Sequence, residues 1–331
     1  MNRHWSIILT IFLISCFNRD LSDDIIAPPE KIYFENGTCK CPDASVGETE
    51  VINGVTYTVV NNSTIVNQIA IDNVNLCTTL VTDMTELFKD KVSFNSDINF
   101  WDTSNVTTMQ GMFYGASKFN QSLSEWDTSS VIDMSNMFDS ASAFNQNIGG
   151  WSTGSVTYMS YMFSDAIAFN KDIGSWNTLN VTNMSYMFSN AISFDIDIGN
   201  WKVSNVTDMM HMFSMATIFN QDIGGWNTVK VTDMSYMFDQ ASTFNQNIGN
   251  WNTSSVINME GMFRKAITFN QNIGGWNTSN VNYMSYMFNE ASGFNQDLSG
   301  WCVTKINSEP TDFSLYSSLI ESYKPVWGAC P

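Results

Sequence analysis

Few residues of this 331-residue chain have the types and spacing that catalysis requires. Histidine occurs only at His4, in an apolar N-terminal stretch, and at His211. A zinc site with several histidines is therefore excluded, and a Ser-His-Asp or Cys-His hydrolase would depend on His211 alone. The sequence contains neither a Gly-rich phosphate loop nor a dinucleotide-binding fingerprint. We therefore predict that the protein is not an enzyme, and that it has no catalytic residue and no cofactor.

A row of aspartates at a 25-residue spacing offers carboxylate chemistry. Glycoside hydrolysis needs only two carboxyl groups several ångströms apart, and stacked segments would place these side chains about 4.7–5 Å apart. An active site is single and asymmetric, however, whereas this row repeats and asparagine interrupts it. Calcium between the segments is the alternative, but no Asp-rich loop of known spacing supports it, so we predict no metal. The row is Asp172, Asp197, Asp222 and Asp297, with Asn147, Asn247 and Asn272.

Cys16 ends a basic and apolar N-terminal segment that is typical of a secretory signal peptide. The letters Leu13-Ile14-Ser15-Cys16 are similar to the bacterial lipobox, in which cleavage leaves a lipidated cysteine at the new N-terminus. We therefore predict lipidation of Cys16, and an ordinary signal peptide with an incidental cysteine is the alternative. The polar, acidic residues that follow are expected to form a tether.

The other five cysteines favour disulfides, because the segment at the N-terminus predicts export. Cys302 and Cys330 flank the segment after the last repeated tryptophan, and we expect them to bond. Cys77 is expected to bond to Cys41 or Cys39, and the sequence leaves this choice open. Between them, "EVINGVTYTVVNN" predicts a β-hairpin around Asn53-Gly54.

The elements that must position these residues follow a strict period. Nine tryptophans, from Trp101 to Trp301, recur every 25 residues without insertion or deletion. Repeats of this length indicate a solenoid, in which each unit buries its apolar face against its neighbours. The predicted parts are a lipoprotein signal peptide at 1–16, a tether at 17–38, an N-terminal cap at 39–75, a solenoid at 76–300 with eight full units at 101–300, and a C-terminal cap at 301–331.

Each unit has places 1 to 25, counted from its tryptophan. Val, Met, Met, Phe and Ala at places 6, 9, 12, 13 and 16 have the spacing of one short helical segment or of a run of helical turns. Phe at place 19 and Ile at place 23 predict a short extended segment with both side chains on one face. One strand and one helical segment per unit predict an α/β repeat, a solenoid of the leucine-rich-repeat type.

Two polar rows are expected to have structural roles. Asparagine at place 20 should bond to the backbone of its own turn, because buried polar groups need partners. Threonine at place 3 is expected to cap turns, and a flat ice-binding threonine face is the alternative, although Val203 interrupts it.

The unit "WNTVKVTDMSYMFDQASTFNQNIGN" at 226–250 resembles the 25-residue repeat of the BspA-like leucine-rich-repeat surface proteins, which occur as bacterial lipoproteins and in some protists. The resemblance covers about 76–331. It implies a right-handed solenoid displayed on the cell surface, with adhesion as the associated role. Asp195-Ile196 and Lys202-Val203 depart from the pattern.

Our first functional hypothesis is therefore a non-enzymatic adhesion module: a monomeric lipoprotein, exported and lipid-anchored at the bacterial outer membrane or cell surface, that binds an extracellular protein or glycan. The net charge of −18 disfavours nucleic acid as a partner. The least typical unit, 201–225, predicts a contact patch. Its members are Lys202, Val203, Met210, His211, Met215 and Ile218.

The alternative is a surface protein that binds polysaccharide or is associated with carbohydrate degradation. Tyrosines at predicted exposed places could stack on sugars, and the competing interpretation is that they cover an amphipathic seam. The tyrosines are Tyr158, Tyr161, Tyr186, Tyr236, Tyr283 and Tyr286.

Overall fold

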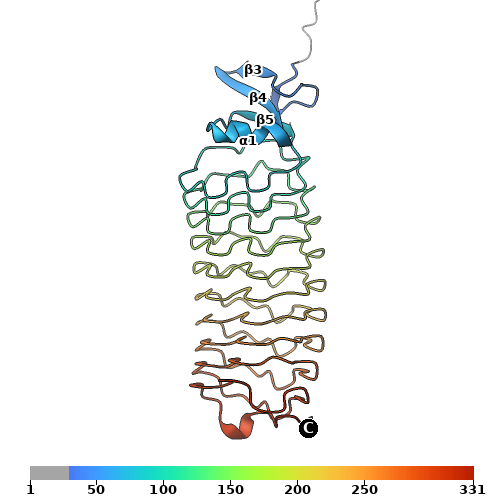
Figure 1. Ribbon diagram of the computed structural model, residues 1–331, viewed down its shortest axis with the longest axis vertical. Helices are drawn as coiled ribbons and strands as arrows, with labels where there is room; N and C mark the ends of the chain where they lie inside the picture. Colours follow the sequence, from blue (N-terminus) through green and yellow to red (C-terminus); the bar gives the residue numbers. More distant parts are fainter. Residues whose placement is uncertain (1–29) are drawn as a thin grey trace, which may run out of the picture. The chain divides into compact units, whose positions relative to one another are not determined.

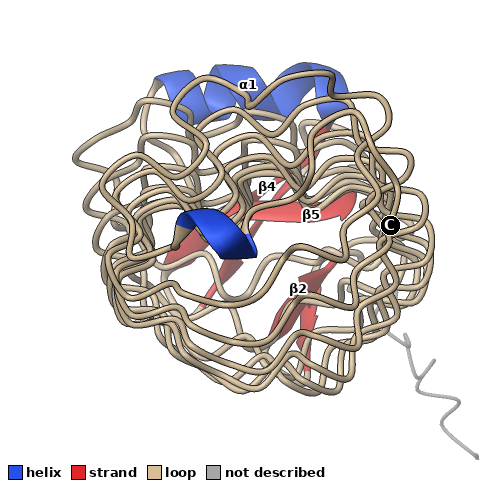
Figure 2. Cartoon of the chain, turned by 90° about the horizontal axis from the view of Figure 1, so that it is seen from below, coloured by secondary structure: helices blue, strands red, loops and turns tan. Residues whose placement is uncertain are grey.

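The computed structural model describes residues 30–331, of which Lys31–Pro331 form one compact unit. In this unit, successive 25-residue segments form coils that stack on one another between two caps (Figure 1). Viewed along the stack, the coils superimpose into one closed outline (Figure 2). The protein is thus a repeat protein. The predicted signal peptide, Cys16 and the tether up to residue 29 lie outside the described residues.

Short strands and one helix form the N-terminal cap. Asn53 and Gly54 have φ values of 53° and 81° and join two antiparallel strands, as a two-residue hairpin turn requires. The predicted hairpin is confirmed. Asn61 caps the helix through the N–H groups of Ser63 and Thr64. The elements are β1 (Tyr33–Glu35), β2 (Thr38–Lys40), β3 (Thr49–Ile52), β4 (Val55–Asn61), α1 (Asn62–Ala70) and β5 (Leu76–Leu80). In the described part of the chain, no helix is long and apolar enough to cross a membrane.

The cap begins earlier than the sequence indicated. Residues 31–38, predicted as the end of the tether, form β1 and the start of β2, because Ile32 is buried against Cys39, Val59 and Cys77. A disulfide joins Cys41 to Cys77, and Cys39 is a buried free thiol.

The coils contain turns where helical segments were predicted. The regular structure that links them is a ladder of single parallel β-bridges at place 8, which runs from Asp83 to Tyr283. The predicted strands at places 19–23 and the helical segments at places 6–16 are therefore both wrong. Places 11 and 15 adopt left-handed backbone angles, for example 58° at Tyr186 and 56° at Asn190, which an α-helix excludes.

Hydrogen bonding explains why turns mimic helical spacing. The N–H groups at places 9, 11, 13 and 15 donate to the next coil, as Tyr186 does to the Met210 carbonyl at 2.8 Å. The N–H groups at places 12, 14 and 16 donate three residues back within the coil, as Met187 does to Met184 at 3.2 Å. Consecutive three-residue turns therefore place the same apolar residues inward that a helix would.

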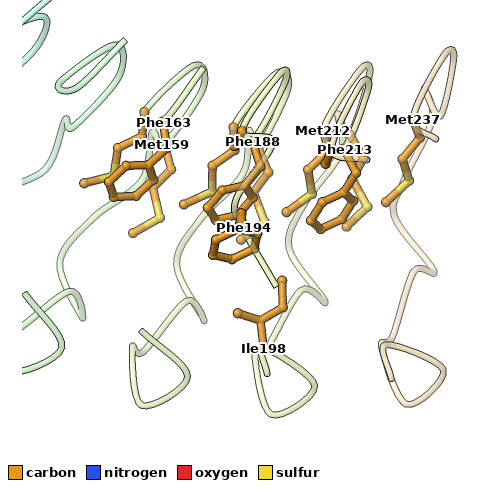
Figure 3. Close-up of a cluster of buried hydrophobic side chains, with 14 of the residues drawn as sticks. Met159, Phe163, Phe188, Phe194, Ile198, Met212, Phe213 and Met237 are labelled. Carbon is orange, nitrogen blue, oxygen red and sulfur yellow. The ribbon is translucent and has the colours of Figure 1, made fainter. Parts of the chain in front are cut away.

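The core is a set of aromatic and methionine rows that run along the stack. Phe163, Phe188 and Phe213 come from successive coils and stack at centroid distances of 5.7 and 5.8 Å (Figure 3). Most neighbouring pairs of the repeated tryptophans also stack, and from Trp126 onward each indole N–H donates to a carbonyl 28 residues earlier, as in Trp176 to Ile148 at 3.2 Å. The inward rows thus bury apolar surface without leaving indole donors unpaired.

Two polar rows tie one coil to the next. The Asn220 side-chain oxygen accepts from the Asn245 N–H at 2.9 Å and from the Gln246 amide at 3.1 Å. The asparagine row is therefore structural, but it bonds the next coil rather than its own turn. The Thr178 hydroxyl donates to the Lys202 carbonyl at 3.2 Å, and the threonines of this row are buried. The ice-binding alternative is wrong because the row presents no exposed face.

The C-terminal cap continues the bonding pattern and then ends the stack. Coil 276–300 donates its N–H groups to Thr311, Phe313 and Leu315. The Phe313 ring is turned by 84° against Phe288, so parallel ring stacking stops there. A disulfide between Cys302 and Cys330 and the 3-10 helix η1 (Glu321–Tyr323) lie within the cap.

Candidate functional site

We call the residues at places 11, 14 and 15 of each coil the turn edge. These places form one surface: the Asn136 amide donates to Asp139 at 3.2 Å, and the Ser140 hydroxyl donates to the same carboxylate at 2.9 Å. Left-handed backbone angles at places 11 and 15 and the bonds to the next coil fix the edge. These backbone bonds form whichever residue type occupies the edge.

Four consecutive coils carry aromatic rings at place 11, and these rings form one stack. Tyr161, Tyr186, His211 and Tyr236 follow one another at centroid distances of 4.4, 4.5 and 4.8 Å, with interplanar angles of 7°, 14° and 7°. We call these four residues the ring row. Tyr186 and His211 have a ring against each face, so what they present outward is mainly ring edges and polar atoms.

Gly261 closes the C-terminal end of the ring row. A Cβ atom at this position would lie 2.3 Å from a Tyr236 ring carbon, so the glycine leaves the space that the ring occupies. The Tyr236 hydroxyl donates to the Glu260 carboxylate at 2.8 Å, and the Arg264 guanidinium carbon lies 5.7 Å from the ring centroid. Arg264 also binds Asp239 through two hydrogen bonds of 2.8 and 2.9 Å.

The ring row is uncharged near neutral pH. Burial lowers the pKa of His211, with Arg264 adding to the effect and Asp239 and Asp233 opposing it. Burial, together with the neighbouring Tyr186, raises the pKa of Tyr161 to about 12. Burial and the bond to Glu260 raise the pKa of Tyr236 to about 12. The row is therefore a neutral strip on an acidic protein.

Of the six residues of the patch predicted in coil 201–225, the structure places His211 and Met215 on the turn edge, whereas Val203 is only 1% exposed, so its place in the patch is wrong. Tyr161, Tyr186 and His211 are neighbours in the ring row, and Met215, which is 37% exposed, lies on the turn edge of the same coil as His211. Met210 is half-buried beside His211 in the chain, and its N–H donates to Asp208. Lys202 is exposed at place 2, outside the turn edge.

Sequence reasoning placed the tyrosines and His211 in two separate hypotheses. Their shared place 11 was the available signal that they form one row. Tyr286 also has place 11, but Gly261 separates it from Tyr236. Tyr158 and Tyr283 lie at place 8 instead, in the bridge ladder, and are 47% and 57% exposed.

The aspartate row has a local role. The Asp172 carboxylate accepts from the Gly174 N–H at 2.9 Å, and Asp222 accepts from Gly224 in the same way. Such bonds two residues along the chain stabilise turns. Within residues 30–331, no group of three or more His, Cys, Asp or Glu side chains is arranged to hold a metal ion.

Comparison with known proteins gives a family without an assigned activity. No curated protein matches the sequence. Three overlapping stretches, residues 55–165, 145–240 and 211–322, match a family described as "Mycoplasma protein of unknown function, DUF285", and they extend from the hairpin of the N-terminal cap into the C-terminal cap. Because these matches cover well over half of the 331 residues, the chain belongs to this DUF285 family of repeat-containing proteins.

Proposed function

We propose that this protein is a non-enzymatic, cell-surface binding module whose turn edge contacts an extracellular protein. The observation that carries the proposal is the ring row with Met215 beside it. The fold does not require rings at place 11, because Gly111, Asn136 and Gly261 occupy that place in other coils with similar backbone angles. The aromatic residues are thus additional to what stacking of the coils needs.

The ring row fits a protein partner better than a sugar. A sugar ring stacks on an open aromatic face, whereas the faces of Tyr186 and His211 are covered by their neighbours. Aromatic residues and methionine are enriched at the centres of protein interfaces, and the outward ring edges and polar atoms of the row could pack against and hydrogen-bond to a protein surface there. Exposed Ile167 and Ile192 in two of the same coils add apolar area.

The remaining parts of the proposal come from the N-terminal sequence and from the repeat pattern. A lipid on Cys16 would anchor the exported monomer at the outer membrane or cell surface, and the BspA-like resemblance supports adhesion and a right-handed coil. The acidic charge disfavours nucleic acid.

The test is binding of the purified chain to a panel of extracellular-matrix proteins and to a glycan array, with and without calcium. The triple variant Met210→Ser, His211→Asn and Met215→Gln uses residues that other coils carry at these places, so the fold should persist. We expect saturable binding to a protein that weakens at least about ten-fold in the variant, in the range of a hot-spot loss. Lys202→Asn is the matched control, since Asn227 has the same place. Unchanged binding by the triple variant would refute the role of the ring row.

Polysaccharide binding is the second candidate, favoured by the exposure of Tyr158 and Tyr283 at place 8. Asn183 and Asn258 occupy the same place, so Tyr158→Asn with Tyr283→Asn keeps the ladder. Glycan binding that disappears in this double variant and persists in the triple variant would favour a polysaccharide ligand, whereas the opposite pattern would exclude this surface.

A further inference from the structure

Two aspartates occupy the same place of the turn edge four coils apart. Asp139 and Asp239 both have place 14, and only 7% and 3% of their surfaces are exposed. In each coil the side chain at place 15 donates to the carboxylate, Ser140 to Asp139 at 2.9 Å and Gln240 to Asp239 at 3.3 Å. The two sites therefore present a buried carboxylate at the same place of the coil, with Asn136 at place 11 beside Asp139 and Tyr236 at place 11 beside Asp239.

A guanidinium from the next coil neutralises Asp239. Arg264, also at place 14, donates from Nε and from one terminal nitrogen to the two carboxylate oxygens, at 2.8 and 2.9 Å. This two-bond geometry is the strongest common form of carboxylate recognition. It shows that a carboxylate at place 14 can bind a guanidinium that reaches back from place 14 of the next coil.

Asp139 has no such counter-charge. The residue that corresponds to Arg264 is Ser164, whose hydroxyl donates to Asp165 at 3.3 Å instead. Asp139 accepts only from the neutral Asn136 amide and the Ser140 hydroxyl, and no Lys, Arg or His of residues 30–331 pairs with it. A buried carboxylate without a cation is costly. Burial accordingly raises the pKa of Asp139, and the nearby Asp165 carboxylate adds to this effect.

We propose that Asp139 binds the guanidinium of an arginine side chain from the extracellular protein partner. This guanidinium would be placed relative to Asp139 as the Arg264 guanidinium is placed relative to Asp239. This inference rests on the proposed function. Ser164 is small where Arg264 is long, and the exposed Asp165 carboxylate, which accepts hydrogen bonds from Ser164 and Asn190, lies at the same edge. Tyr161 begins the ring row in the coil of Ser164, so the arginine would dock at one end of the proposed contact surface.

Arginine is preferred to lysine by geometry. The planar guanidinium offers two parallel N–H groups to one carboxylate, whereas an ammonium is a point charge that binds water more strongly. The site should therefore select arginine even in isolation from the rest of the partner.

The first experiment titrates the full chain with N-acetyl-arginine amide and follows the Asp139 carboxyl resonance by NMR. We expect saturable shifts in the wild type, at least about ten-fold weaker binding in Asp139→Asn, and weaker binding of N-acetyl-lysine amide. Equal shifts of surrounding resonances in the wild type and in Asp139→Asn would overturn the proposal.

The second experiment leaves Asp139 intact and introduces an arginine side chain into the protein itself, at position 164 of the next coil. Ser164→Arg should raise the melting temperature and abolish binding of the arginine amide, because the new side chain copies Arg264. Ser214→Arg is the matched control, since Ser189 rather than aspartate precedes it at place 14. A Ser164→Arg variant no more stable than Ser214→Arg would overturn the proposal.

The outcomes separate this inference from the proposed function. If the amide binds through Asp139 but no extracellular protein binds, the function fails and the arginine site stands. If a protein binds the wild type and Asp139→Asn equally well, the function stands and the arginine site fails.

Discussion

The inward rows and the turn edge of the same coils differ in how strictly they repeat. Place 13 is phenylalanine in every coil from Phe88 to Phe288, whereas place 11 is Glu, Gly, Asn, Tyr or His. An inward ring is held by rings on both sides, as Phe188 is by Phe163 and Phe213. At the turn edge the backbone bonds are the same for every residue type, so the side chain is not dictated. Variation there is available for binding without loss of the fold.

Truncation of an inward ring should have the largest effect. Phe188→Ala removes a ring that is fully buried between two coils, and we expect it to lower the free energy of unfolding by about 3–5 kcal/mol. Urea denaturation checks this value, and a split transition would show that the coils on either side have become uncoupled. The control is Tyr186→Asn, two residues earlier on the turn edge, with an expected cost below about 1 kcal/mol. Equal costs would contradict the distinction between the two regions.

Removal of the Arg264 guanidinium should have the second-largest effect on stability. It would leave the buried Asp239 carboxylate without a cation, as Asp139 is in the wild type. Arg264→Gln leaves a buried charge and should cost about 2–3 kcal/mol, below the roughly 3–5 kcal/mol of fully buried pairs, because the Arg264 side chain is 32% exposed. Urea denaturation of the wild type and of Arg264→Gln at neutral pH measures this cost. A cost that persists in the double variant with Asp239→Asn would point to lost packing on Tyr236 instead of lost charge.

Periodicity predicted the architecture better than the local conformation. The 25-residue spacing located the coils and the inward residues, because burial between neighbours imposes one pattern whatever the backbone does. It misassigned the backbone, because Met234, Met237 and Ala241 have the spacing of a helix as well as that of consecutive turns. Backbone propensity did not predict these turns either. Tyrosine and glutamine rarely adopt left-handed backbone angles, yet Tyr236 and Gln240 do so here, where their N–H groups bond to the next coil.

The sequence identified the individual residues of the ring row but did not predict that their rings stack on one another. Tyr161 and His211 were identified for different reasons, and the stack that joins them depends on side-chain direction at a turn that sequence patterns do not reveal. The tether boundary failed for a related reason: burial of Ile32 depends on contacts with Val59 and Cys77, which lie far along the chain.

Protonation of His211 should give the smallest effect and distinguish the ring row from the pH-insensitive inward rows. Burial places the pKa of His211 in the folded protein below its value of about 6.5 in the unfolded chain. The unfolded chain therefore binds the proton first as the pH falls. The contribution of neutral His211 is complete above about pH 6.5 and is lost as the pH decreases through the lower folded pKa.

Wild type should thus lose stability relative to His211→Asn as the pH falls below about 6.5. Urea denaturation of both proteins across this range measures the difference, and the other titrating groups are common to both. A difference that is flat with pH would mean that the imidazole titrates alike in the two states. The ring row would then tolerate a charged ring between Tyr186 and Tyr236, and the neutral character that we ascribe to it would be incorrect.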